Sequence, residues 1–139
     1  MDVLVLIGRI LFVPLFLGSA VGHLTQTDGM AGYAKSRGVP AARIAVLGTG
    51  VMLAVGGVLV LLGLWADLGA LILVAFLVPT AFLMHAFWKE TDPQARQNEM
   101  VQFLKDLALA GASLMLFAFF AYVGDDLGLT ITGPLFDLN

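Results

Sequence analysis

Four long apolar runs dominate the sequence and constrain its fold more than any other feature. They cover approximately residues 3–24, 40–65, 68–88 and 100–123 of the 139. Each reaches the roughly 20 residues that a helix needs to cross about 30 Å of hydrocarbon. None alternates apolar and polar residues as a barrel strand does, and only helices or closed barrels satisfy the backbone in lipid. The sequence therefore predicts an all-α integral membrane bundle of four transmembrane helices, in one domain over residues 1–139.

Composition excludes the other broad classes of protein. Hydrophobic residues make up 60% of the chain and charged residues 12%, against roughly 45–50% and about 25% in soluble domains. Disorder needs high net charge, which is −3 here, and nucleic-acid binding needs a basic patch that seven Lys and Arg residues do not make. With no cysteine, thiol and iron–sulfur chemistry are excluded within this chain. Any redox role therefore needs a cofactor from elsewhere.

The connections between the runs are short. Arg9 and Pro14 interrupt the first run, and no cleavage pattern accompanies it, so we expect a retained helix rather than a signal peptide. Residues 29–38 are predicted to form a short interfacial helix between the first and second spans, ended by Gly38 in a left-handed conformation. Almost nothing joins the second and third runs, so these helices are predicted to be antiparallel neighbours. Residues 127–139 are expected to form a tail along the interface.

Basic residues near the helix ends predict the orientation in the membrane. Helix parity places the connections after the first and third spans on one side. That side holds or adjoins six basic residues: Lys35, Arg37, Arg43, Lys89, Arg96 and Lys105. Only Arg9 belongs to the other side. The sequence therefore predicts that both termini are extracytoplasmic and that the two polar connections face the cytoplasm.

Small residues spaced four apart predict where the helices approach one another closely, because lipid offers no hydrophobic driving force between them. Three pairs have this spacing: Gly18 with Gly22, Gly50 with Ala54, and Ala108 with Ala112. We expect these pairs to mark helix interfaces. Gly56 and Gly57 could instead make room for a ligand, although small residues in membrane helices usually serve packing.

Two histidines and a carboxylate are predicted to converge at one membrane face. His23 lies in the last turn of the first predicted helix, His85 in the last turn of the third, and Asp106 early in the fourth. Ionisable groups at membrane depth are costly, so each is a functional candidate. A neutral imidazole offers one donor and one acceptor, so the three could bind the carbonyls of a quinone, relay protons, or hold a metal or haem. Asp106, Lys105 and Glu99 could instead satisfy the histidines in a purely structural network.

Arg9 is the second ionisable candidate. It lies about two turns into the first predicted helix, towards the outer face, where Asp67, Asp125 and Asp126 stand at neighbouring helix ends. A buried arginine is stabilised by an acidic partner or by reaching the interface with its charged end. We therefore expect a structural ion pair between Arg9 and one of these carboxylates, or a snorkelling anchor.

Several short segments follow one another in a characteristic order. They are Gly8-Arg9, Gly32-Tyr33-Ala34, Gly38-Val39-Pro40, Leu61-Leu62-Gly63-Leu64-Trp65, His85-Ala86-Phe87-Trp88, and Phe103-Leu104-Lys105-Asp106-Leu107-Ala108-Leu109-Ala110-Gly111. Each piece is short and apolar, so the order and the spacing carry the likeness. The pattern, which extends from Gly8 to about Gly111, resembles the DoxX family of small bacterial four-helix membrane proteins.

The resemblance implies roles for particular positions. Arg9, His85, Trp88 and Lys105 match recurrent polar or aromatic positions of the family. The chain departs from the family at three places: His23 stands where relatives often have lysine, Asp106 where they often have asparagine, and Ala66-Asp67 where they often have a Thr-Arg-like turn. The first two departures add a titratable pair to the histidine cluster.

The resemblance also implies a function, an accessory subunit of a bacterial respiratory or redox-stress complex in the plasma (inner) membrane. In this hypothesis His23, His85, Trp88 and Asp106 contact a quinone head group or a partner, and a metal or haem is disfavoured. The expected partners are the lipid bilayer and a larger membrane or redox complex or a second copy of the chain, with no nucleic acid. Two alternatives stay open: the membrane subunit of a thiosulfate:quinone-type oxidoreductase, and a structural protein or carrier of small apolar molecules. The chain alone is expected to be non-catalytic.

Overall fold

The computed structural model describes residues 1–138, and its regular structure is helical. The long helices are α1 (Asp2–Thr25), α3 (Ala42–Leu62), α4 (Ala66–Met84) and α5 (Pro93–Val123). A short helix, α2 (Thr27–Ser36), joins α1 to α3, and single 3-10 turns, η1 (Phe87–Lys89) and η2 (Gly124–Asp126), flank α5. Among the described residues, four helices are long and apolar enough to cross a membrane. The predicted fold class and the short helix between the first two spans are therefore confirmed.

Two helix boundaries differ most from the predictions. α5 begins at Pro93 rather than near residue 100, because the Asp92 carboxylate accepts a hydrogen bond from the Ala95 amide (2.8 Å) and Pro93 fills the first helical position. α4 ends at Met84, so His85 follows the helix as its capping residue instead of lying in its last turn. The early start of α5 matters for function, because it places Glu99 within a helix.

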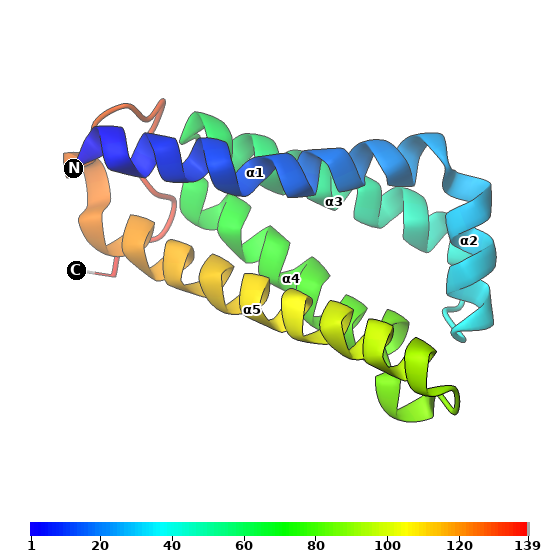
Figure 1. The fold of residues 1–139 in the computed structure, drawn as a ribbon. Helices are drawn as coiled ribbons and strands as arrows, with labels where there is room; N and C mark the ends of the chain where they lie inside the picture. Colours follow the sequence, from blue (N-terminus) through cyan, green and yellow to red (C-terminus); the bar gives the residue numbers. More distant parts are fainter. Residues whose placement is uncertain (139) are drawn as a thin grey trace.

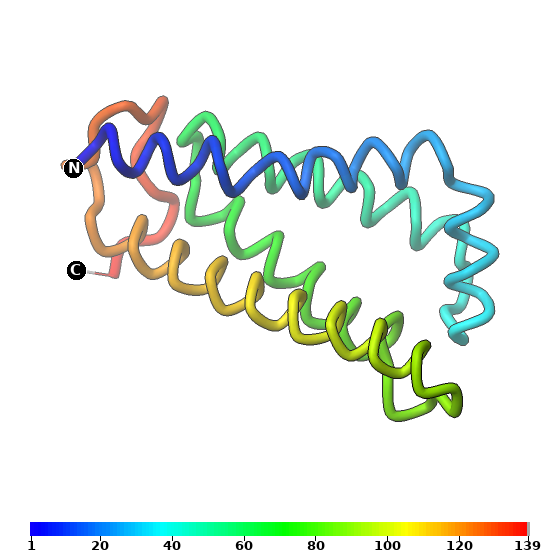
Figure 2. Tube along the Cα trace, viewed as in Figure 1, coloured from blue at the N-terminus to red at the C-terminus, as the bar shows by residue number. Residues whose placement is uncertain are grey.

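The helices follow one another around the bundle, with α1 packed on α3, α3 on α4, and α4 on α5. Figure 1 shows both termini at one end and α2 across the opposite end, where it packs against α3. The tube in Figure 2 makes the divergence clear: the α1/α3 pair and the α4/α5 pair lie together near the termini and separate towards α2. We call these the terminal end and the α2 end.

The divergence follows from where α3 and α4 touch. Gly63 ends α3 in the left-handed region (φ +65°), which turns the chain directly into α4. Next to this turn, a Cβ on Gly69 would lie 2.9 Å from the carbonyl oxygen of Gly56, so the two backbones are in close contact. Because the closest approach is beside the turn, α3 and α4 separate towards their other ends.

The main hydrophobic core is made of buried side chains from all four long helices. Its buried members are Val13, Phe16, Ala20, Leu53, Val60, Ala70, Leu73, Leu77 and Ala110. The predicted close contact at Gly50 is confirmed, since a Cβ there would meet the Cβ of His23 at 2.8 Å. The prediction that Gly18 and Gly22 lie at a helix interface was wrong within this chain. A Cβ at either position would meet no atom of another helix within 4 Å.

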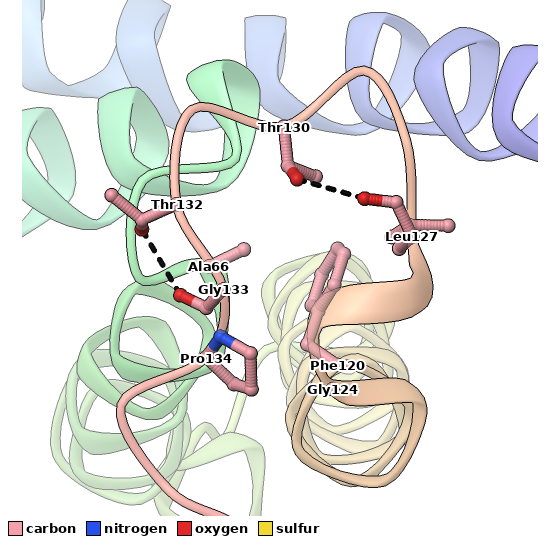
Figure 3. A pocket seen from close by; sticks show the side chains of 8 residues that line it. All are labelled: Ala66, Phe120, Gly124, Leu127, Thr130, Thr132, Gly133 and Pro134. Atoms are coloured by element: carbon pink, nitrogen blue, oxygen red, sulfur yellow. Dashed lines mark hydrogen bonds between the residues drawn. The ribbon is translucent and has the colours of Figure 1, made fainter.

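The C-terminal segment, residues 127–138, folds back over the terminal end. The amides of Ile131 and Thr132 donate to the Gly63 carbonyl oxygen at 3.0 and 3.1 Å, which ties the segment to the α3–α4 turn. Figure 3 shows the segment curving between this turn and the end of α5. The cavity drawn there has a volume of about 10 Å³, enough for about one water molecule. This end of the bundle is therefore closed.

Candidate functional site

A cavity of about 600 Å³ occupies the α2 end, where the helix pairs diverge. Ligand pockets in proteins measure roughly 300–1,000 Å³, so this one has room for a small organic molecule. Its apolar wall includes Met30, Val39, Val46, Met52, Phe76, Pro79, Leu83 and Met84. His23, His85 and Asp106 all line it. The structure thus brings together the three ionisable residues that the sequence placed at one membrane face.

His23 contributes to the α1 side of the cavity. Its Nδ1 lies 3.1 Å from the carbonyl oxygen of Val46 and 3.0 Å from the Thr49 hydroxyl, both on α3. Its ring packs edge-to-face with that of Phe76 on α4, with centroids 5.9 Å apart. The close approach of α1 to α3 depends on Gly50, which leaves room for the His23 Cβ. The imidazole is therefore held through one nitrogen by its neighbour helix.

His85 contributes to the opposite side, just beyond α4. Its Nδ1 lies 2.7 Å from Oε2 of Glu99, and its Nε2 lies 3.7 Å from Oδ2 of Asp106. Asp106 is buried in α5, and Lys105 Nζ approaches its other carboxylate oxygen at 3.8 Å. His85 is therefore set between two carboxylates of α5, one of which faces the cavity.

Tyr33 of α2, which lines the cavity, and Arg37, the residue that caps the end of α2, extend this network. The Tyr33 hydroxyl donates to Glu99 Oε1 (2.9 Å), and Arg37 pairs with Glu90 (2.7 Å) and Glu99 (3.2 Å). Arg37 also donates to the Tyr33 oxygen and lies over the ring, 5.2 Å from its centroid. Burial raises the pKa of Tyr33 above its usual value, the Arg37 hydrogen bond opposes this shift, and the Glu99 carboxylate adds to it.

Tyr33, Arg37 and Thr49 were not among the candidates from sequence. Tyr33 lies in α2 and Arg37 caps its end, four residues later, a spacing that places both on one face of the helix. This spacing is the sequence feature from which their contact could have been predicted. Thr49 carries no signal of its own, because its role depends on the distance between α1 and α3. Glu99 was expected to satisfy a histidine, and the structure gives it that contact.

Trp88 does not line the cavity in the described structure. Its ring packs in an aromatic group with Phe82, Phe87 and Phe103, at centroid distances of 6.2, 5.3 and 5.5 Å. The side chain remains about half exposed on the outside of the bundle. The structure thus places Trp88 beside the site, on the turn that follows His85.

The residues predicted to pair at the terminal end have other partners. Arg9 is buried, and its Nη2 donates to the Leu129 carbonyl oxygen (2.5 Å), while Nε and Nη1 have no hydrogen-bond partner among the described residues. The Asp67 carboxylate, fully buried, accepts from the amides of Leu135 (2.9 Å) and Phe136 (2.7 Å). Asp125 and Asp126 are exposed in η2. The structure therefore does not bring Arg9 together with these carboxylates, and backbone groups of the C-terminal segment take their place.

The cavity suits an apolar molecule that carries a polar head. Its walls are mainly apolar, and its polar groups lie on opposite sides, at His23 and at the His85–Asp106 pair. Within residues 1–138, no three His, Asp or Glu side chains gather closely enough to hold a metal ion. The histidines and Asp106 offer hydrogen bonds to a ligand in the cavity.

The fold and the site define a small four-helix integral membrane protein with a cavity open between its helix pairs. Residues 4–86 match the DoxX family model, and the chain belongs to the DoxX family. It is 31% identical over 114 residues to the inner membrane protein YphA of Escherichia coli strain K12, a match covering 82% of this chain and 81% of that relative. No solved structure matches the chain.

Proposed function

We propose that this protein binds the head group of a quinone-type molecule in the cavity at the α2 end, as an accessory subunit of a bacterial membrane redox assembly. One observation carries the proposal: a cavity of about 600 Å³ brings His23, His85 and Asp106 together inside apolar walls. The size fits a small ring system with part of its tail, and the diverging helix pairs leave room for an apolar tail.

The ionisable residues themselves support a ligand role. Intramembrane His and Asp side chains are costly and are usually retained for a functional reason. Hydrogen bonds within the chain engage one nitrogen of each histidine, and each residue still lines the cavity. Asp106 lines the cavity beside His85, with its Oδ2 3.7 Å from Nε2 of the imidazole.

We infer the membrane location from the relative YphA, which is named as an inner membrane protein. In the orientation that the basic residues predict, both termini are extracytoplasmic and the cavity lies near the cytoplasmic face. Arg37, Lys35 and Arg43 all belong to the α2 end. With no cysteine in the chain, electrons would come from a partner subunit, and the present chain would hold the quinone near it.

Native mass spectrometry of the protein, released from its own membrane in mild detergent, tests this proposal. We expect a retained quinone-type mass, or a defined redox partner, on the unaltered protein. The variant His85→Ala should remain inserted and folded and lose most of that occupancy, whereas Lys35→Ala, an exposed change on α2, should retain it. A protein that carries only phospholipid, with and without His85, would contradict the proposal and favour a structural or carrier role.

A further inference from the structure

We infer that the cavity selects the reduced, hydroxyl-bearing form of its ligand, a quinol, over the oxidised quinone. The inference rests on the proposed function and adds to it the redox state of the ligand. It follows from the direction of the hydrogen bonds that fix the two histidines, because those bonds decide whether each imidazole offers the cavity a donor or an acceptor.

The tautomer of His23 is set by α3. The Val46 carbonyl oxygen, 3.1 Å from Nδ1, can only accept a hydrogen bond. The Thr49 hydroxyl, 3.0 Å from Nδ1, already donates its proton to the Ala45 carbonyl oxygen at 2.7 Å and so also accepts. Both neighbours require the proton on Nδ1. In a neutral imidazole the second nitrogen, Nε2, then carries the lone pair and acts as an acceptor.

The same reasoning applies to the other side of the cavity. Glu99 accepts from Nδ1 of His85 (2.7 Å), so that nitrogen carries a proton. The 3.7 Å between Nε2 and Asp106 Oδ2 is too long for a hydrogen bond. If His85 is neutral, its Nε2 is an acceptor; if it is charged, Nε2 donates towards Asp106, and the remaining carboxylate lone pairs are acceptors. In either form the His85–Asp106 pair has more lone pairs than protons to offer.

A backbone carbonyl group of α4 is a further hydrogen-bond acceptor in the cavity wall. Pro79 has no N–H to donate to the carbonyl oxygen of Ala75, four residues earlier, and both residues line the cavity. Among the lining side chains, Lys105 only donates, whereas Ser19, Gln26, Tyr33, Thr49 and Thr80 carry groups that both donate and accept. Lys105 is partly exposed and already donates to Gln102 Oε1 (2.5 Å). The lining groups that only accept, namely the Asp106 carboxylate, the Ala75 carbonyl and the unprotonated histidine nitrogen, therefore outnumber Lys105, the lining side chain that only donates.

The quinone and the quinol differ in whether their oxygen atoms accept or donate hydrogen bonds. A quinone presents two carbonyl oxygens, which only accept hydrogen bonds, whereas a quinol presents two hydroxyl groups, which donate. Opposite His23 and the His85–Asp106 pair, quinone oxygens face lone pairs, and quinol hydroxyls find partners. A buried acceptor left without a donor costs free energy, and this cost falls on the quinone complex.

Anaerobic binding to the purified protein in lipid nanodiscs, followed by tryptophan fluorescence, tests the inference with three matched probes. These are a decyl-chain benzoquinol, the corresponding quinone, and the corresponding 1,4-dimethyl ether, which keeps the ring and tail and has no hydroxyl donor. We expect the quinol to bind about tenfold more tightly than the quinone or the ether, a difference of about 1.4 kcal/mol. This comparison needs no variant, so a folding defect cannot obscure it.

Two variants locate the selectivity. His23→Gln places a group that both donates and accepts at the α1 side, and we expect the preference for quinol to fall to about threefold. Met115→Leu, on the exposed outer face of α5, is the matched control and should keep the tenfold preference. Equal binding of quinol, quinone and ether would overturn the inference and leave the proposed function standing. Failure of all three probes to bind would overturn both.

Discussion

The two ends of this bundle bury ionisable side chains in different ways. At the terminal end, Asp67 is fully buried and its oxygens accept backbone amides of the C-terminal segment. At the α2 end, His23, His85 and Asp106 line a cavity of about 600 Å³. The corresponding space at the terminal end is about 10 Å³. Burial of an ionisable residue therefore does not by itself mark a ligand site, and the open volume beside it distinguishes the two ends.

The comparison also shows what closes each end. The C-terminal segment closes the terminal end through main-chain hydrogen bonds, which leave no room for a ligand. At the α2 end, α2 packs on α3, and side chains join it to the α4/α5 pair through the contacts of Tyr33 with Glu99 and of Arg37 with Glu90 and Glu99. Side-chain bridges between partly exposed groups contribute less than a closed main-chain network and are more easily broken. We therefore expect the α2 end to open on a faster timescale than the terminal end.

Removal of the Asp67 carboxylate has the largest expected effect. Asp67→Ala deletes the acceptor for two backbone amides, and hydrogen bonds to a charged group contribute roughly 1.5–3 kcal/mol each. We expect the free energy of unfolding to fall by about 3 kcal/mol and the C-terminal segment to become sensitive to protease, with little change in ligand affinity. Asp126→Asn, on an exposed carboxylate of the same end, is the control. A stable Asp67→Ala protein would mean that the segment does not hold this end together.

Gly50→Ala should have the next largest effect, at the opposite end. The added Cβ would meet the Cβ of His23 at 2.8 Å and Leu24 at 3.1 Å, and overpacking of this kind costs about 1–3 kcal/mol. We expect a lower melting temperature together with a loss of ligand affinity, because His23 moves. Gly48→Ala, on the same helix with no atom within 4 Å, should lower neither. Equal behaviour of the two variants would contradict the close contact of α1 and α3.

The Glu99→Gln variant tests the side-chain bridge across the α2 end. It removes the charge that Tyr33, Arg37 and His85 share, and we expect a loss of about 1 kcal/mol, as for a partly exposed ion-pair network. The clearer readout is faster amide hydrogen exchange in α2 with unchanged exchange in residues 127–138. Arg43→Gln, which breaks an exposed pair with Asp28, should leave α2 protected. Unchanged exchange in Glu99→Gln would show that packing on α3 alone holds α2.

The smallest expected effect is on the titration of Tyr33. Burial and the Glu99 carboxylate raise the pKa of Tyr33 above its usual value near 10. The stabilisation linked to this protonated hydroxyl is present below about pH 10 and is lost as the pH rises through the raised pKa. The difference in phenolate absorbance between the protein and its Tyr33→Phe variant reports the midpoint. Glu99→Gln should lower that midpoint, and a midpoint that stays the same would place the Glu99 charge away from Tyr33.

Much of the fold could be predicted because lipid permits few backbone arrangements. Four apolar runs of sufficient length fixed the helix count, and helix parity brought His23, His85 and Asp106 to one face. The start of α5 was missed because Asp92 and Pro93 are a capping signal within a segment that looks like a polar loop. That error hid the helical position of Glu99.

The cavity and the terminal closure could not be predicted, for physical reasons. The cavity depends on the angle between α3 and α4, which the contact of Gly56 with Gly69 sets beside the turn. Asp67 was one of three carboxylates offered as a partner for Arg9, since charges are visible in a sequence. Its actual partners are the amides of Leu135 and Phe136, and every non-proline residue carries an amide, so the sequence holds no signal for the choice.

Photolabelling tests most directly the claim that the α2 end is the ligand site. A photoreactive azidoquinone is bound to the protein in nanodiscs, irradiated, and the labelled residues are mapped by mass spectrometry, with unlabelled quinol as competitor. We predict competed labels around His23, Met30 and Met84, which line the cavity, and none in residues 127–138. Competed labels at the terminal end, or labels spread over the lipid-facing surface that quinol does not displace, would contradict the account.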